Sequence, residues 1–128
     1  MGMTAAPKYI SLFSGCGGLD LGFSRAGYVG HLSIDIDDAA IAVHRENLGS
    51  PVQKIDLSQS ELDGVNIEDL DVLLAGSPCQ GFSTAGNRRV DDPRNSLLLV
   101  APRIASKYRP KVVVAENVPG ALVGEHRA

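Results

Sequence analysis

The chain has 128 residues and a formal net charge of −3, with 44% hydrophobic and 21% charged residues. This composition is typical of an ordinary folded domain and excludes a disordered, fibrous or strongly basic protein. No apolar run approaches the roughly 20 residues of a membrane span and no signal peptide opens the chain, so we expect a cytoplasmic protein.

Short apolar runs alternate with helical segments in the first half of the chain. The expected elements are a strand at 9–13, a glycine turn at 15–18, a helix at 19–26, a strand at 28–34 and a helix at 38–47. Gly27 ends the first helix, and acidic residues at 35, 37 and 38 are suited to capping the second.

The second half continues this alternation. Its expected elements are a short strand at 52–55, a polar connection at 58–69, a strand at 72–75, a helix at 95–108 and a strand at 112–115. Pro102 should kink the last helix or cost about 3 kcal/mol. Apolar strands separated by helices predict an α/β fold, with a mostly parallel sheet covered by helices on both faces.

Charge is distributed unevenly along the chain. Residues 1–85 hold four basic and eleven acidic side chains, whereas residues 86–111 hold seven basic and two acidic ones. This basic stretch follows closely after Cys79. It is either a solvated helix face or a surface that contacts phosphates.

A glycine turn, Phe13-Ser-Gly-Cys-Gly-Gly18, joins the first strand to the first helix, and Asp35 follows Gly15 by 20 residues. This separation is expected when an acid binds a ribose hydroxyl of a nucleotide held at the turn. NAD and S-adenosylmethionine both contain that ribose. An anionic Asp20 at the helix start disfavours a pyrophosphate, so S-adenosylmethionine fits better. The alternative is a turn that only reverses the chain, with Asp35 as a helix cap.

Cys79 lies in the octapeptide Gly76-Ser-Pro-Cys-Gln-Gly-Phe-Ser83, directly after an apolar strand. Proline and glycine constrain this segment so that the thiol points outward at the top of the sheet. The alternative is an inert buried thiol. Two reduced thiols, Cys16 and Cys79, are expected rather than a disulfide.

Glu116 begins the tripeptide Glu-Asn-Val118, at the same end of the next predicted strand. A thiol can add to an electron-poor ring carbon while a nearby acid hydrogen-bonds the ring nitrogen, and C6 and N3 of cytosine offer this arrangement. A buried environment that raises the pKa of this acid would help. The alternative is a glutamate that pairs with an arginine.

These three motifs, in this order, resemble those of the DNA cytosine-5 methyltransferase family. The resemblance runs from about Ile10 to Val118. It implies a Rossmann-like, S-adenosylmethionine-dependent methyltransferase fold that is truncated at its C-terminal side. It also implies S-adenosyl-L-methionine as the cofactor and double-stranded DNA as the substrate, with no metal ion and no membrane.

The resemblance assigns a role to each matching residue. Cys79 would be the nucleophile at C6 of a flipped-out cytosine, and Glu116 would interact with N3. The implied cofactor contacts are Phe13, Gly15, Cys16, Gly17, Gly18, Asp35, Ile36, Asp56, Leu57, Gly76, Pro78 and Leu97. The implied substrate contacts are Gln80, Ser83 and Asn117. Asp35 is shorter than the glutamate usual in the family.

Members of the family continue well beyond the third motif, into a Gln-x-Arg-x-Arg motif and a target-recognition region that this sequence lacks. We therefore expect residues 1–128 to be a single partial catalytic domain, which is either one half that works with a separate C-terminal half, or a truncated fragment, or a degenerate remnant. The alternatives are a non-catalytic module that binds S-adenosylmethionine or a partner, a tRNA-directed cytosine-5 methyltransferase, and an NAD-linked oxidoreductase.

Overall fold

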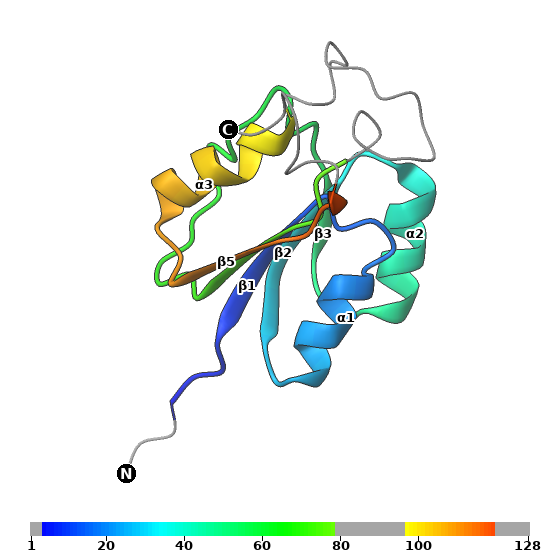
Figure 1. Ribbon diagram of the computed structural model, residues 1–128. Helices are drawn as coiled ribbons and strands as arrows, with labels where there is room; N and C mark the ends of the chain where they lie inside the picture. The colour runs from blue at the N-terminus through cyan, green and yellow to red at the C-terminus, as the bar shows by residue number, and fades with distance from the viewer. Residues whose placement is uncertain (1–3, 79–96, 120–128) are drawn as a thin grey trace.

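The computed structural model describes residues 4–78 and 97–119. Within them, five parallel strands form a sheet in the order β3-β2-β1-β4-β5. The strands are β1 (Lys8–Leu12), β2 (Val29–Asp35), β3 (Val52–Lys54), β4 (Val72–Ala75) and β5 (Val112–Ala115). Their carboxyl ends share one edge of the sheet, at the top of Figure 1. The chain reverses its direction of winding between β1 and β4, the position at which open α/β sheets bind ligands.

Helices cover both faces of this sheet, which confirms the predicted fold class (Figure 1). The helices are α1 (Gly18–Arg25), α2 (Asp38–Asn47) and α3 (Val100–Tyr108). α1 and α2 lie on one face and α3 lies on the other. Among the described residues, no helix is long and apolar enough to cross a membrane.

The main hydrophobic core lies between the sheet and α3. It contains Ile10, Leu12, Leu32, Ile34, Leu57, Leu62, Leu70, Leu73, Ala75, Val100, Ala101 and Ile104. On the opposite face, Tyr9, Val72 and Leu74 pack against Phe23 and Tyr28. Successive residues of β1 thus alternate between the two cores, as the period of a strand requires.

Most elements lie close to their predicted positions, and the helix at 38–47 and the strands at 72–75 and 112–115 have the predicted bounds. Asp37 caps α2 by accepting a hydrogen bond from the Ala40 amide at 2.9 Å. Gly27, just after α1, has a φ of +94°, which a glycine adopts at little cost. Helix caps and tight turns depend on residues that are close in the sequence, so both could be predicted from it.

The predicted kink at Pro102 is wrong, because α3 begins at Val100 and this proline falls in its first turn. Backbone amides in the first turn of a helix have no intrahelical partner, so a proline there removes no hydrogen bond. Residues 95 and 96 of the predicted helix lie outside the described residues. Arg109 ends α3 with a φ of +51° and donates its amide to the Ala105 carbonyl at 2.8 Å.

β5 departs from the prediction of a sheet covered on both faces. Val112 and Val113 are 52% and 45% exposed, whereas every residue of β4 is buried. β5 occupies the edge of the sheet, where an apolar strand has fewer neighbours. Lys111 binds the Asp71 carboxylate at 2.5 Å at the start of this strand pair, and this hydrogen bond lowers the pKa of Asp71.

We expect Pro102→Ala to change the free energy of unfolding by less than about 1 kcal/mol, because no helical hydrogen bond depends on that position. Ser106→Pro, at an exposed position later in α3, should cost about 3 kcal/mol. Urea denaturation followed by circular dichroism measures both. A larger loss from Pro102→Ala than from Ser106→Pro would contradict the observed helix start.

Candidate active site at the carboxyl ends of the strands

The turn between β1 and α1 depends on glycine at two positions. Gly15 and Gly17 have φ angles of +56° and +92°. A Cβ atom on Gly17 would also overlap Leu48 and come within 2.8 Å of His44 Cδ2, whereas one on Gly15 would meet nothing within 4 Å. The turn is therefore built on left-handed backbone, and at Gly17 it packs directly against α2.

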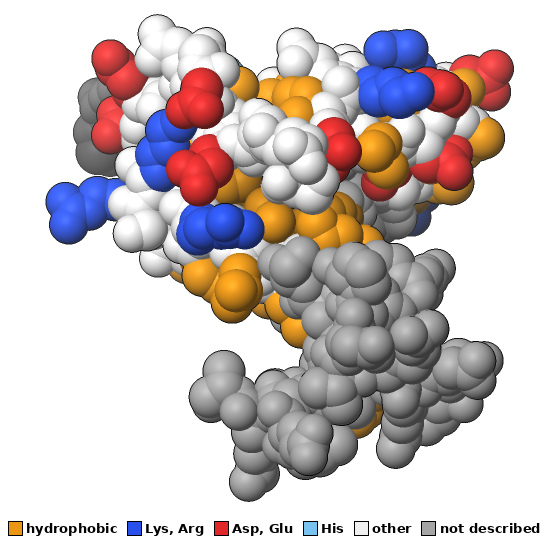
Figure 2. Space-filling model, turned by 90° about the horizontal axis from the view of Figure 1, so that it is seen from above, with side chains coloured by type: hydrophobic (Ala, Val, Ile, Leu, Met, Phe, Trp, Pro, Cys, Tyr) orange, Lys and Arg blue, Asp and Glu red, His pale blue; other side chains and the backbone are white. Residues whose placement is uncertain are grey.

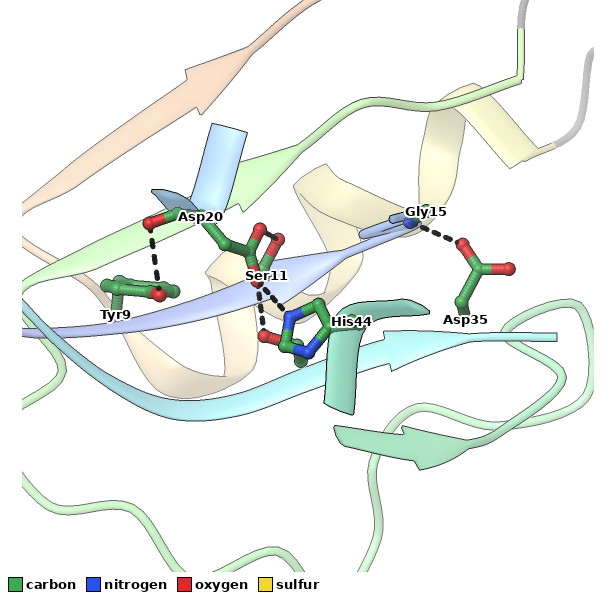
Figure 3. A network of polar contacts seen from close by, with 7 residues as sticks. Tyr9, Ser11, Gly15, Asp20, Asp35 and His44 are labelled. Atoms are coloured by element: carbon green, nitrogen blue, oxygen red, sulfur yellow. Dashed lines mark hydrogen bonds and ion pairs between the residues drawn. The ribbon is translucent and has the colours of Figure 1, made fainter. Parts of the chain in front are cut away.

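The Asp35 carboxylate ties this turn to the end of β2. Its Oδ2 accepts the Gly15 amide at 2.8 Å (Figure 3). Its Oδ1 accepts the amides of Ile36 and Asp37 at 2.8 and 2.9 Å. A carboxylate has about four acceptor positions, so one remains for a ligand hydroxyl. The sequence predicted that Asp35 binds a ribose hydroxyl or caps a helix. It did not predict the hydrogen bond from the Gly15 amide.

A cavity of about 280 Å³ lies at this end of the sheet. Its walls are formed by Phe13, Asp35, Ile36, Ile55, Asp56, Leu57, Ser58, Gly76, Pro78 and Leu97. Eight of these residues are among the twelve predicted cofactor contacts. The other four, Gly15, Cys16, Gly17 and Gly18, belong to the adjoining glycine turn. Ile55 and Ser58 were not predicted, although they flank the predicted pair at 56 and 57.

Figure 2 looks onto this end of the molecule, where hydrophobic side chains gather between charged ones. Asp56 accepts hydrogen bonds from the hydroxyl and the amide of Ser58, at 2.6 and 2.9 Å, and these bonds lower its pKa. The described walls carry two acids and no lysine or arginine. Such a cavity suits a ligand with an apolar ring, hydroxyl groups and a positive charge better than a phosphate.

The segments after β4 and β5 lie side by side next to this cavity. Glu116 donates its amide to the Ala75 carbonyl at 2.9 Å, and Asn117 Nδ2 donates to the Ser77 carbonyl at 3.5 Å. Pro78 lines the cavity, and the residue after it is Cys79. Parallel strand pairing thus brings the segment that follows β4, as far as Pro78, next to the segment that follows β5. Cys79, Gln80 and Ser83 themselves lie outside the described residues.

Glu116 is exposed, so its carboxyl group does not lie in the buried environment that would favour the predicted chemistry. Glu116 directly follows β5, which is the edge strand of the described sheet. In this arrangement the carboxyl group is accessible to a ligand that enters from solvent. Cys16 is exposed as well, in the glycine turn.

Asp20 does not face a ligand at the start of α1, which corrects the interpretation that its charge repels a phosphate there. Its side chain is fully buried and accepts hydrogen bonds from the hydroxyls of Ser11 at 2.6 Å and Ser33 at 2.5 Å. His44 Nε2 lies 2.9 Å from the same carboxylate (Figure 3). Two serines inside otherwise apolar strands were the sequence signal for this network, which sequence reasoning missed.

The basic residues of α3 are engaged within the chain. Lys107 binds the Asp63 carboxylate at 2.6 Å, and Arg103 Nε donates to the Leu99 carbonyl at 3.3 Å. These contacts favour the solvated helix face over a phosphate-binding surface for this part of the basic stretch. Its arginines at 88, 89 and 94 lie outside the described residues.

The family profile described as C-5 cytosine-specific DNA methylase matches residues 7–128. The chain belongs to this family. Type II methyltransferase M.XorII of Xanthomonas oryzae is 41% identical over an alignment of 128 positions, which covers 94% of this methylase chain and 30% of that relative. Type II methyltransferase M.AquIA of Picosynechococcus is 38% identical over 90% of the chain and 50% of that relative.

Solved structures agree with this membership. A protein described as a DNA modification methyltransferase, encoded within a prophage of E. coli, superposes with a TM-score of 0.81 at 35% identity, over 94% of this chain and 34% of its own. The Dnmt2 methyltransferase of S. pombe shares the fold, with a TM-score of 0.72 at 20% identity over 96% of this chain and 38% of its own. The methylase chain thus spans between about a third and a half of the length of these relatives.

No group of three or more histidine, cysteine, aspartate or glutamate side chains suited to a metal ion occurs within residues 4–78 and 97–119 of this methylase chain. The polar side chains of the cavity are instead bonded to backbone amides and to a serine. Membership of a DNA methylase family also leaves the NAD-linked oxidoreductase without support.

We expect Gly17→Ala to destabilise the chain by about 2–5 kcal/mol, because left-handed strain adds to the overlap with α2. Gly15→Ala is the matched control: it also has a positive φ but open space, so it should cost only about 1–2 kcal/mol. Urea denaturation compares the two. Equal losses would show that the packing of Gly17 on α2 does not matter.

Proposed function

We propose that this chain forms the cofactor-binding and nucleophile-bearing part of a DNA (cytosine-5-)-methyltransferase, with S-adenosyl-L-methionine as the methyl donor. One observation carries the proposal: eight predicted cofactor contacts, from five separate segments, line one cavity. This cavity adjoins the strand ends that lead to Cys79 and Glu116. The family membership supports the same assignment.

The residues around the cavity fit the parts of S-adenosylmethionine. Apolar side chains of Phe13, Ile36 and Leu57 would contact the adenine ring, and Asp35 would bind a ribose hydroxyl. The negative charge of Asp35 and Asp56 suits a cationic ligand. The glycine turn at 15–18 would hold the rest of the cofactor. When bound, S-adenosylmethionine supplies the electrophilic methyl group.

Cys79 and Glu116 would act on a cytosine that has been flipped out of the DNA. The Cys79 thiolate would add to C6 while Glu116 hydrogen-bonds N3, and the electron density that reaches C5 makes this carbon nucleophilic. After C5 has been methylated, loss of its proton to a base expels the thiolate and restores the aromatic ring. The exposed position of Glu116 suits a substrate that arrives from solvent.

Asn117 would support this chemistry from the neighbouring position. Its side chain bonds to the Ser77 carbonyl, so it joins the segment before Cys79 to the segment after β5. A side chain that links these two segments would keep the thiol and the acid at a constant separation. Gln80 and Ser83 would contact the DNA around the extruded base.

Efficient methylation would require the additional length that the relatives have. The chain covers 30% of one curated relative and 50% of another. Regions that hold the target base and read the DNA sequence would come from that additional length, either in the same polypeptide or in a separate C-terminal half. We expect weak cofactor binding and poor turnover from the 128 residues alone.

Trapping with 5-fluorocytosine DNA tests the nucleophile. With S-adenosylmethionine and a C-terminal half from a relative, the chain should form a covalent adduct that persists, because fluorine cannot leave C5 as a proton does. Cys79→Ser should abolish the adduct, and mass spectrometry should locate it on the peptide that contains residue 79.

Cys16→Ser is the matched control, since Cys16 is the exposed cysteine of the glycine turn and should not form the adduct. An adduct that survives Cys79→Ser but disappears with Cys16→Ser would contradict the proposed role. Cofactor binding without any adduct would favour the non-catalytic module. A trapped complex with tRNA, and none with DNA, would show that the substrate is tRNA.

Ile36→Ala tests the cofactor cavity separately. Ile36 lines the cavity and is 56% exposed, so we expect little change in stability but a roughly 3- to 10-fold loss of S-adenosylmethionine affinity, from the apolar contact removed. Val43→Ala is the control, because Val43 is a similarly exposed residue of α2 outside the cavity. Isothermal titration calorimetry measures both, and equal affinities for the two variants would exclude this cavity as the cofactor site.

A further inference from the structure

A buried ionisable pair joins four elements beneath the glycine turn. Asp20 lies in the first turn of α1 and His44 lies in α2, and both side chains are fully buried. The Asp20 carboxylate also accepts hydrogen bonds from Ser11 of β1 and Ser33 of β2, which are directly opposed in the sheet. Figure 3 shows Ser11 of β1 and His44 of α2 beside the Asp20 carboxylate.

Hydrogen-bond chemistry fixes the roles in this network. The serine hydroxyls donate to the carboxylate, and the tautomer of His44 that carries its hydrogen on Nε2 would donate to Asp20 Oδ2, 2.9 Å away. Two hydroxyls and one imidazole nitrogen thus surround the buried carboxylate of Asp20, so its oxygens have partners. The carboxylate also lies close to the positive end of α1. The start of α1 is therefore held in a single position relative to both strands and α2.

His44 also contacts the glycine turn itself. The position that a Cβ of Gly17 would occupy lies 2.8 Å from His44 Cδ2 and 3.3 Å from its Nε2. Gly17 is the residue before α1, and Asp20 is the third residue of that helix. The imidazole thus meets the turn on one side and holds the first turn of α1 on the other.

Apolar side chains could fill the space that Asp20 and His44 occupy between the sheet and the helices. Replacing a buried ion pair by apolar side chains of similar volume is often neutral or stabilising, whereas removing one partner is strongly destabilising. The other core of the chain, between the sheet and α3, consists of apolar residues. Filling space alone therefore does not account for a polar network at this position.

We propose that His44 is a positioning residue for the cofactor site, acting through Asp20 and through its contact with Gly17. The imidazole sets where the glycine turn lies relative to Asp35, and so sets the shape offered to the cofactor. This inference rests on the proposed cofactor-binding function of that turn. His44 does not itself line the cavity.

The experiment compares His44→Leu, which fills the space but loses the donor, with His44→Gln, whose amide can still donate to Asp20. Val72→Ala is the control for general destabilisation, because Val72 is buried at the amino end of β4, away from the turn. Two readouts are needed: S-adenosylmethionine affinity by calorimetry, and amide hydrogen exchange of the turn. Gly15, Gly17 and Leu21 donate the amide hydrogen bonds that report its geometry.

We expect His44→Leu to lower the affinity at least about 10-fold and to accelerate exchange of the turn amides beyond the change in global stability. His44→Gln should restore the affinity to within about 3-fold of the unaltered chain. Val72→Ala should leave the affinity unchanged and accelerate the turn amides no more than the rest of the core. If His44→Leu behaves like Val72→Ala in both readouts, the proposal is wrong.

His44→Asn keeps the proposal testable if the leucine variant does not fold. Its shorter amide cannot reach Asp20 from the same backbone position, so it should lose affinity where glutamine retains it. The same measurements distinguish an error in the proposed function from an error in this inference. If the unaltered chain binds no S-adenosylmethionine, while turn exchange still responds to His44 variants, the turn is positioned as proposed but is not a cofactor site.

Discussion

The hydrogen bond from the Gly15 amide to the Asp35 carboxylate joins the end of β1 to the end of β2, and the candidate site is arranged around it. The left-handed backbone of Gly15 belongs to the turn that presents this amide. Asp35 uses its other oxygen for the amides of Ile36 and Asp37, which leads the chain into α2. The Asp35 carboxylate therefore holds the glycine turn in place, forms part of the cavity wall and fixes the backbone that leads into α2.

The short side chain of Asp35 determines which groups its carboxylate can reach. A glutamate at this position would place its carboxylate farther from the backbone. Aspartate keeps its oxygens close to the chain, where three backbone amides reach them. The acid at this position thus contributes to the architecture of the site whether or not a ligand is bound.

Features that depend on neighbouring residues were predictable from the sequence. The helix capped by Asp37 and the apolar strand at 72–75 follow from capping chemistry and periodicity. Features that depend on the assembled sheet were not. The effect of Pro102 depends on where α3 begins, and the exposure of β5 depends on its place at the edge.

The candidate site also has features that the sequence predicts and features that only the assembled fold determines. The motifs identified most of the residues around the cavity, because parallel strands bring their following segments to one edge. The direction of Asp20 could not be read from its position in the chain, since an acid at a helix start can face either solvent or the core. Only the fold brings Ser11, Ser33 and His44 to it. Cys79, Gln80 and Ser83 lie outside the described residues, so their roles stay predictions.

The exposed valines of β5 bear on how the protein behaves in concentrated solution. An edge strand with free backbone amides and carbonyls is a template on which another strand can pair, and natural proteins usually protect such edges with charge, proline or a bulge. Here the lysine next to the strand is bound to Asp71 at one end, and the valines that follow carry no charge. Among the described residues, self-association would therefore use this edge, which runs along the side of the sheet, whereas the cavity lies at the carboxyl ends of the strands.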